Sequence, residues 1–386
     1  MSIGPAAQLA AEPEPDRALT DEVLEVLRGT GLTQVGVAAA DPFTGTYSDL
    51  LERRAAGLHG GMSFTYRNPR RSTEPGRIVD GAASLVVGAL GYLRPDPPGE
   101  QTPVVAGRVA RYAWADSYRE LTAALEVGAA VLRRAGHEAR IVVDDNALVD
   151  REAARRAGVG WYGRNANLLL PGQGSWFVLG SIVTDALLVR SSQVEPGCGA
   201  CTRCLDGCPT GAIVAPGVVD ARRCLAWLLQ AEGTFPREWR VALGDRMYGC
   251  DDCQEVCPPN IARRRQPLTA PDTEARATVD VAMFLDDDDA SVMAAAGRWY
   301  VARRQARYLR RNALIVVGNS GDPSDPRVLG LVRAALAHAD PLVRGHAVWA
   351  AGRLGRPDLA DGLDATEADP MVRDELDRRR EVPARS

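Results

Sequence analysis

All eight cysteines of the chain lie between residues 198 and 257, and their spacing predicts a metal-binding region. The first run is Cys198, Cys201, Cys204 and Cys208, followed by Pro209. The spacing C-x2-C-x2-C-x3-C-P is typical of [4Fe–4S] ligation, in which three thiolates reach one cluster and the fourth cysteine serves a second cluster. The proline ends the loop and turns the chain away. The run therefore predicts two clusters rather than one.

The second run is Cys250, Cys253 and Cys257, followed by Pro258, and Cys224 lies between the two runs. Eight cysteines supply two four-iron clusters with none left over. We assign one cluster to Cys198, Cys201, Cys204 and Cys257, and the other to Cys208, Cys224, Cys250 and Cys253. Paired C-x2-C groups also suit Zn²⁺, which is the alternative interpretation. Three cysteines at intervals of three, followed by Cys-Pro, favour the clusters, and two neighbouring clusters indicate one-electron transport.

Composition limits what the rest of the chain can be. The 386 residues are 46% hydrophobic and 25% charged, as in a globular protein of two or three domains. No run of about 18 apolar residues predicts a membrane span, and the N-terminus does not resemble a secretory or twin-arginine signal. We therefore expect a cytoplasmic protein, in which thiols stay reduced and cysteines bind metal rather than form disulfides. The net charge of −4 argues against a wholly basic nucleic-acid binder but permits a local basic face.

Residues 1–190 have an α/β pattern. Apolar, β-rich runs at 33–39, 84–93, 140–144 and 177–185 alternate with helical patterns such as 117–136, which predicts a layered α/β domain. Residues 191–265 carry the cysteines and little apolar periodicity, so the metal must hold this second domain together.

Residues 266–386 contain an internal repeat. The segments 307–321 and 341–355 match at a spacing of 34, which pairs Arg310 with Arg344 and Gly318 with Gly352, and residues 369–376 restart the pattern. The spacing predicts a short HEAT-like array of helical pairs as a third domain.

Longer blocks resemble one enzyme family. The stretch "VDDNALVDREAARRAGVGWYGRNANLLLPGQGSWFVLGSIVTD" (143–185), the first cysteine run and "GDRMYGCDDCQEVCPPN" (244–260) are similar to epoxyqueuosine reductases, as are "HGGMSFTYRNPRR" (59–71) and "GRVARYAWADSYRE" (107–120). The resemblance covers roughly residues 20–355. It implies a nitroreductase-like α/β domain that binds cobalamin, a ferredoxin-like domain with two [4Fe–4S] clusters, and the last step of queuosine synthesis on tRNA.

The resemblance also implies roles for single residues. Asp144 occupies the position of the family's proton donor beside the cobalt face; from the residues alone, an aspartate after a strand is a turn or helix-capping residue. The resemblance places further cofactor contacts at Arg71, Arg151, Arg164, Tyr248, Gly249, Asp251 and Asp252. Arg164 stands where the family usually has lysine.

Two departures concern the same pocket. The family's Asp-x-Gly-Pro is here Asp144-Asp145-Asn146-Ala147, and its Asp-Tyr-His is Ser117-Tyr118-Arg119. They leave the electron-transfer interpretation intact and bear on the exact substrate.

The chemistry implied is the reduction of an epoxide to an alkene, which consumes two electrons and two protons. Cobalamin can collect single electrons from the clusters, and a buried carboxyl with a raised pKa can donate a proton at neutral pH. Asp144 follows a strand, where ligands bind in many α/β domains. None of the four histidines, His59, His137, His338 and His346, lies in the motif that supplies a lower cobalt ligand, so we expect base-off cobalamin without a histidine ligand.

The segment 297–313 carries six arginines together with Trp299, Tyr300 and Tyr308. Arginines pair with phosphates and aromatic rings stack on unpaired bases, so this segment is a candidate surface for a tRNA anticodon stem-loop. On one helix, Arg303, Arg307, Arg310 and Arg311 would lie near one face. The alternative is a solvated arginine-rich helix. We further expect a monomer that receives electrons from an external one-electron donor such as a flavodoxin or ferredoxin.

Three other functions fit parts of the pattern. A cobalamin and iron–sulfur reductase of a small molecule, similar to the reductive dehalogenases, would fit the cofactors, but those enzymes are typically exported and lack HEAT repeats. A non-catalytic electron carrier would bind no cobalamin. A repeat-based tRNA scaffold with structural clusters would bind tRNA without turnover.

Overall fold

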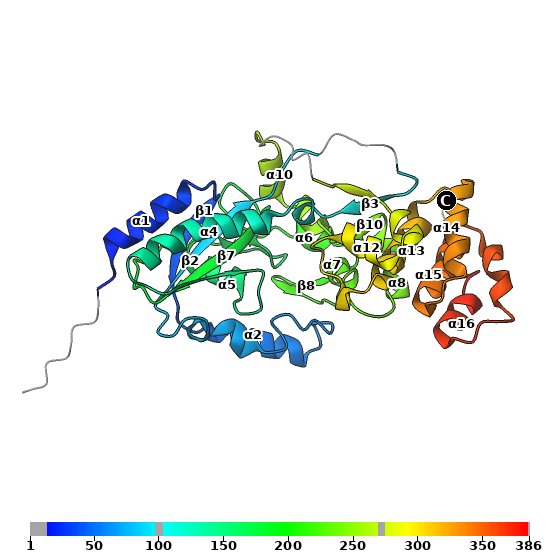
Figure 1. Cartoon of the computed structure of the whole chain (residues 1–386), viewed down its shortest axis with the longest axis horizontal. Helices are drawn as coiled ribbons and strands as arrows, with labels where there is room; N and C mark the ends of the chain where they lie inside the picture. The colour runs from blue at the N-terminus through cyan, green and yellow to red at the C-terminus, as the bar shows by residue number, and fades with distance from the viewer. Residues whose placement is uncertain (1–13, 97–102, 269–274, 385–386) are drawn as a thin grey trace, which may run out of the picture.

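The computed structural model describes residues 14–96, 103–268 and 275–384. Most of the N-terminal stretch that shows no signal sequence lies outside these residues. Figure 1 shows the α/β part at one end of the long axis, the cysteine-bearing part in the middle and the helical repeats at the other end. No helix in the described ranges has both the length and the apolar character needed to cross a membrane.

The α/β part is built on a four-stranded sheet in the order β1-β2-β7-β4. Its strands are β1 (Gln34–Ala39), β2 (Ser84–Gly91), β7 (Phe177–Thr184) and β4 (Ala139–Val143). Every neighbouring pair is antiparallel, with Leu85 opposite Val183 and Ile141 opposite Ile182. The four apolar runs are thus confirmed as strands. The ligand-site rule for strand ends rests on parallel sheets, so it does not apply to Asp144 here.

Both faces of this sheet are covered, which explains why its strands are apolar throughout rather than alternating. The helices α1 (Arg17–Arg28) and α4 (Ser117–Arg134) pack on the face that carries Val86 and Ile182. The helix α5 (Asp150–Arg156) packs on the opposite face, against Leu85 and Val87. The helices α2 (Thr44–Ala55) and α3 (Pro69–Thr73) precede the strand β2.

A second sheet joins all three expected domains. The strand β3 (Ala106–Val109) pairs with β10 (Arg246–Tyr248) on one side and β11 (Thr278–Asp280) on the other. Its strands come from the α/β, cysteine-bearing and C-terminal segments in turn. The expected boundaries at 190 and 265 therefore divide the sequence, whereas this sheet crosses both.

The cysteine-bearing part consists of short elements, as expected for a region with few large apolar side chains. They are α6 (Arg203–Asp206), β8 (Ile213–Ala215), β9 (Val218–Val219), α7 (Leu225–Leu228), α8 (Arg237–Leu243), α9 (Asp252–Glu255) and α10 (Pro258–Arg264). Its apolar residues pack outward on the repeats, where Leu228, Phe235 and Leu243 join a cluster with Ile315 and Trp349.

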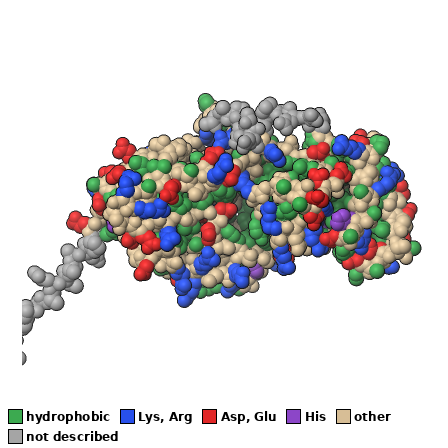
Figure 2. Space-filling model, viewed as in Figure 1, with side chains coloured by type: hydrophobic (Ala, Val, Ile, Leu, Met, Phe, Trp, Pro, Cys, Tyr) green, Lys and Arg blue, Asp and Glu red, His purple; other side chains and the backbone are tan. Residues whose placement is uncertain are grey.

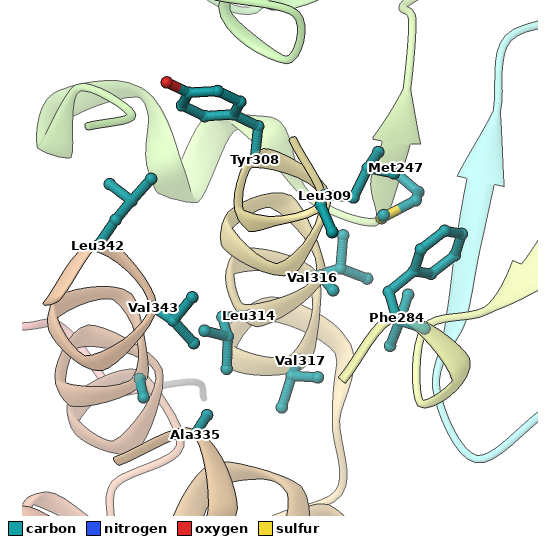
Figure 3. Packing of buried hydrophobic residues seen from close by; sticks show 14 of the residues in the cluster. Met247, Phe284, Tyr308, Leu309, Leu314, Val316, Val317, Ala335, Leu342 and Val343 are labelled. Atoms are coloured by element: carbon teal, nitrogen blue, oxygen red, sulfur yellow. The ribbon is translucent and has the colours of Figure 1, made fainter. Parts of the chain in front are cut away.

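The C-terminal part is an array of helices: α11 (Met283–Asp286), α12 (Asp289–Ala296), α13 (Arg307–Ser320), α14 (Pro326–Leu336), α15 (Pro341–Arg353) and α16 (Pro370–Asp377). Apolar side chains of α13 pack toward Met247 and Phe284 on one side and toward Leu342 and Val343 of α15 on the other (Figure 3). The repeated glycines occupy equivalent close contacts: a Cβ on Gly318 would lie 2.8 Å from the Trp349 ring, and one on Gly352 would lie 2.3 Å from the Arg379 carbonyl. The 34-residue spacing therefore marks where each helix approaches the next.

Candidate active site

The first cysteine group surrounds a cavity. Cys198, Cys201, Cys204 and Cys257 line a space of about 170 Å³ together with Trp161 and Pro258. The pKa of the Cys257 thiol is raised to about 11, mainly by burial; a hydrogen bond from the Asn260 amide opposes the rise, and the thiols of Cys198, Cys204 and Cys201 add to it. This is the set assigned to one cluster from the sequence.

The second group has the same character. Burial raises the pKa of Cys253 well above its ordinary value, with the thiols of Cys250, Cys224 and Cys208 as the next causes. The Sγ atom of Cys208 accepts a hydrogen bond of 3.2 Å from the Ala212 amide. Cys224, which is isolated in the sequence, therefore lies close enough to Cys253 to raise its pKa.

The chemistry of these donors fits a metal cluster. Buried thiols near one another resist ionisation until a metal supplies positive charge, and only thiolates ligate iron. Across the described residues, no three His, Cys, Asp or Glu side chains form a group that could hold a single metal ion. Four cysteines around a cavity instead suit a cluster with an iron at each corner.

Asp144 follows the strand β4 in a loop held by several contacts. Its φ of 51° lies in the left-handed region, which costs a non-glycine residue free energy and is found where the surroundings enforce it. The side chain of Asn146 accepts a hydrogen bond of 2.8 Å from the Thr65 amide, and the Ser72 hydroxyl donates to the Asn146 carbonyl at 2.6 Å. Arg71 lies 3.4 Å from Asp145. The loop is therefore anchored to the segment that leads into and through α3.

The carboxyl of Asp144 is open to solvent on one side, yet the protein around it changes its acidity. Partial burial raises the pKa of Asp144, the Arg298 guanidinium opposes this, and Asp145 raises it again. Arg298 donates to the carbonyls of Tyr112 and Ala115. The sequence prediction missed Arg298 as a neighbour of Asp144, because it lies 154 residues further along, in the run considered only for RNA.

A second carboxyl lies behind this loop. Oδ1 of Asp150, at the start of α5, is buried without a hydrogen-bond partner. Burial raises its pKa well above the ordinary value, and Asp144 raises it further while Arg151 lowers it. The prediction missed Asp150 too, although it directly precedes Arg151. Asp144 and Asp150 both raise the pKa of the Tyr118 phenol, after burial.

Arg151 connects this acidic group to the second cysteine group. The positive charge of Arg151 lowers the pKa of Asp150 and of Tyr118, and also that of the Cys224 thiol, in each case against the larger effect of burial. Tyr248 lies two residues before Cys250. Burial raises the pKa of its phenol, Arg298 lowers it and Asp144 raises it. Figure 2 shows this face of the molecule hollowed near its middle, between the α/β part and the helical part. The charges around the Asp144 loop therefore act on residues of the second cysteine group and its surroundings.

Three predicted cofactor contacts lie elsewhere. Arg164 lines the cavity of the first cysteine group and donates to the Gly199 carbonyl at 2.7 Å. Asp252 forms an ion pair of 2.5 Å with Arg246. Asp251 is buried and accepts a hydrogen bond of 2.7 Å from the Arg111 amide.

A separate cavity of about 260 Å³ reaches Cys250 beside β3. It is lined by Asp251 and by Arg108, Arg111, Arg246 and Arg264. Each of these arginines already pairs with a carboxylate. The cavity therefore offers no surplus positive charge for an anionic ligand.

The expectation that four arginines lie near one face of one helix is wrong, because Arg303 precedes α13 and two of the other three are buried. Arg311 is completely buried, and its guanidinium donates to the carbonyls of Leu228, Leu229, Ala231 and Gly233. Arg310 is 5% exposed and pairs with Asp289. Its repeat counterpart Arg344 likewise pairs with Glu367. Arg310 and Arg344 thus stabilise the helical array through ion pairs within it.

The other two remain accessible. Arg303 lies before α13, in a short 3-10 segment, and its exposed side chain pairs with Glu232 at 2.8 Å. Arg307, in the first turn of α13, pairs with Asp340 at 3.0 Å. Of the three aromatic residues in this segment, only Tyr300 is exposed.

The histidines are accounted for as follows. His137 lies 3.2 Å from Asp185 after the end of α4, while His338 and His346 belong to the helical repeats. His59 lies against Tyr66, with ring centroids 5.5 Å apart.

These observations define a class of protein: a double-cluster iron–sulfur oxidoreductase with an α/β domain and a helical-repeat domain. Residues 197–260 match the 4Fe-4S double cluster binding domain, and residues 299–376 match HEAT repeats. An epoxyqueuosine reductase from Alicycliphilus denitrificans is 35% identical over 346 residues, which cover 84% of this chain and 94% of that protein. The chain belongs to the epoxyqueuosine reductase family.

Two solved structures are similar over almost the whole chain. One is an epoxyqueuosine reductase with an epoxyqueuosine-modified tRNA-Tyr stem loop, at 28% identity and a TM-score of 0.85, covering 95% of this chain and 98% of that one. The other is the Bacillus subtilis enzyme with its catalytic loop swung out of the active site, at 29% identity and a TM-score of 0.83, covering 95% and 99%.

Proposed function

We propose that this protein reduces epoxyqueuosine in the anticodon loop of tRNA to queuosine, with loss of water. The observation that carries the proposal is the electrostatic proximity of the Asp144 loop to the second cysteine group, through Arg151 and Tyr248. Family membership supplies the substrate, and the stem loop bound to a relative supports RNA as its carrier.

Cobalamin is the cofactor that fits between these groups. The site offers a carboxyl with a raised pKa, two exposed arginines and a buried tyrosine, and Arg71, Asp144, Arg151, Tyr248 and Gly249 would hold the cofactor. When bound, cobalamin supplies a reduced cobalt that can hold both electrons and react as a nucleophile. We retain the expectation of base-off binding without a histidine ligand.

The residues of the chain perform the remaining tasks. The second cysteine group holds the cluster nearer to Asp144, and the first holds the cluster farther from it. Asp144 keeps a proton closer to neutral pH than an ordinary aspartate does, and donates it from a carboxyl oxygen to the epoxide oxygen that leaves. The overall change consumes two electrons and two protons, breaks both carbon–oxygen bonds of the epoxide and releases water.

The partners follow from this chemistry. An external one-electron donor such as a flavodoxin or ferredoxin would load the first cluster, and the tRNA would approach the exposed Arg303 and the partly exposed Arg307. We propose that the protein acts as a monomer in the cytoplasm, where both the tRNA and reduced thiols are found.

Anaerobic reconstitution tests the proposal. The protein is loaded with iron, sulfide and cobalamin and given reductant with epoxyqueuosine-containing tRNA, and queuosine is measured in the digested tRNA. Wild-type protein should form queuosine, and Asp144→Asn should abolish turnover while leaving cluster and cobalamin spectra unchanged. Asp145→Asn is the matched control, because it removes a neighbouring carboxyl that pairs with Arg71, and it should retain turnover.

Each contrary outcome identifies another function. Absence of cobalamin uptake would leave an electron carrier or a tRNA scaffold. Uptake without queuosine would indicate a reductase of another substrate. Full activity of Asp144→Asn would remove the proton-donor role.

A further inference from the structure

The segment 297–305, which leads into α13, is held in a strained shape. Arg303 and Arg304 have φ angles of 50° and 54°, so two consecutive non-glycine residues are left-handed. Such residues cost about 1–3 kcal/mol each and occur where the surroundings enforce them, often at ligand-binding positions. The Arg304 guanidinium donates to the carbonyls of Gly297 at 3.1 Å and Trp299 at 3.2 Å. The side chain of Arg304 thereby closes the segment on itself.

Tyr300 lies in the middle of this segment, where its main chain is held by a hydrogen bond and its ring is exposed to solvent. Its amide donates a hydrogen bond of 2.8 Å to the Tyr248 hydroxyl. The adjacent Trp299 stacks on Tyr248, with centroids 4.5 Å apart and planes 6° apart, and is 7% exposed. Tyr300 is 55% exposed, the highest value among the exposed large hydrophobic side chains of the described residues. A strained main chain and buried contacts therefore hold Tyr300 in a position where its aromatic ring is exposed to solvent.

The location of Tyr300 relates it to the active site. Tyr248, whose hydroxyl accepts the hydrogen bond from the Tyr300 amide, lies two residues before Cys250. The exposed Arg303 lies three residues after Tyr300 and pairs with Glu232, whose side chain is also exposed. Exposed ion pairs contribute about 0–1 kcal/mol, so Arg303 can exchange this carboxylate for a phosphate at little cost.

We propose that Tyr300 is the stacking platform for an unpaired base of the RNA substrate at the entrance to the active site, with Arg303 contacting the adjacent phosphate. The inference rests on the proposed function and names the residue that would position the RNA. An exposed phenol ring on a rigid main chain stacks a base with little loss of conformational entropy, and such stacking contributes about 1–3 kcal/mol per base. The main-chain contact with Tyr248 would hold the stacked base in register with the reacting nucleoside.

Stem-loop binding tests the platform without relying on turnover. The affinity of the iron–sulfur-loaded protein for an epoxyqueuosine-modified anticodon stem-loop is measured by fluorescence anisotropy, with and without cobalamin. Tyr300→Ala should raise Kd by about 5- to 150-fold, which corresponds to the stacking range above. Tyr300→Phe and Tyr300→Trp should stay within about threefold, because both keep an aromatic face. Val241→Ala, at another exposed apolar position, is the control and should bind normally.

A double-variant cycle identifies the base. Abasic nucleotides are placed at successive positions of the loop, and their effects are compared in wild-type and Tyr300→Ala protein. One abasic position should weaken wild-type binding and have little further effect on Tyr300→Ala, because the two changes remove the same contact. Additive losses at every position would overturn the platform.

Other results would overturn the inference directly. Wild-type affinity of Tyr300→Ala would do so, as would equal losses in Tyr300→Phe and Tyr300→Ala. An effect on cobalamin uptake without one on RNA binding would make Tyr300 a cofactor contact instead. Wild-type protein should form queuosine whether or not Tyr300 stacks a base, so a failure of the platform differs from a failure of the proposed function, in which wild-type protein forms no queuosine.

Discussion

Asp144 lies in the loop after β4 and Asp150 begins the helix α5 that follows, yet the Asp144 carboxyl opens to solvent while Oδ1 of Asp150 is enclosed and has no hydrogen-bond partner. The pKa of each carboxyl is raised, mainly by burial, and Asp150 is also raised by the charge of Asp144. The candidate acid therefore lies in front of a second carboxyl whose burial also favours the protonated form.

This arrangement predicts a stability cost that depends on pH. A carboxyl with a raised pKa binds its proton more tightly in the folded state, so its contribution to stability is complete below the unfolded pKa of about 4 and is lost as pH rises. Asp150→Asn, which has a similar shape and no charge, should raise the free energy of unfolding by about 1–3 kcal/mol at pH 8, the typical cost of an unsatisfied buried group. Thermal melting of the iron–sulfur-loaded protein measures this.

The pH series supplies the control. The advantage of Asp150→Asn should shrink as the pH falls toward about 4, and Asp145→Asn, at a half-exposed position, should change stability by no more than about 0.5 kcal/mol. An advantage that is the same at every pH would show that folding does not raise the pKa of Asp150.

The cysteine assignment predicts which double substitutions share a cluster. Cys224→Ser combined with Cys253→Ser removes two ligands of one cluster, so about four irons per chain should remain. Cys224→Ser combined with Cys257→Ser removes a ligand from each cluster, so both should be lost or become labile. Iron analysis and electron paramagnetic resonance of the reduced proteins distinguish these outcomes. The reverse pattern would exchange Cys253 and Cys257 between the clusters.

Buried and exposed arginines near the start of α13 should behave in opposite ways. Arg311→Met leaves four carbonyls of the cysteine-bearing part without their donor, and should destabilise the protein, because each buried acceptor left unsatisfied costs about 1–3 kcal/mol. Arg303→Met should leave the melting temperature almost unchanged and weaken stem-loop binding. A stable Arg311→Met with impaired RNA binding would restore the RNA role for Arg311.

The sequence predicts parts of this molecule well for identifiable reasons. The strands are recognisable because both faces of the sheet are buried, which makes each run apolar throughout. Their antiparallel order is not recognisable, because alternation of strands and helices leaves strand direction open. The structural role of Arg310 has a signal in its repeat partner Arg344, since a residue required in every repeat serves the array.

Other features leave no comparable signal. The burial of Arg311 depends on carbonyls about 80 residues away, which no local pattern encodes. Arg298 likewise acts on the Asp144 carboxyl from a distant part of the sequence. The cysteine spacing, in contrast, is local chemistry, and it is the part of the site for which sequence is most informative.

The hydrogen bond between the Asn146 side chain and the Thr65 amide should determine how often the Asp144 loop opens. Asn146 stands where the family usually has glycine, and its side chain accepts from the Thr65 amide at 2.8 Å. In a relative, the catalytic loop is found swung out of the active site. Asn146→Gly removes a hydrogen bond worth about 0.5–1.5 kcal/mol and adds about 0.5–1 kcal/mol of main-chain entropy to the open state. Amide exchange in residues 144–147 should therefore accelerate by roughly 5- to 60-fold.

Turnover distinguishes anchoring from general loosening. Asn146→Gly should lower kcat, because Asp144 spends less time in place, while stem-loop affinity and iron content stay at wild-type values. Asn146→Asp keeps an acceptor for the Thr65 amide, and should keep amide exchange slow. Unchanged exchange in Asn146→Gly would mean that the Ser72 hydroxyl, which donates to the carbonyl of residue 146 at 2.6 Å, holds the loop without help from the side chain.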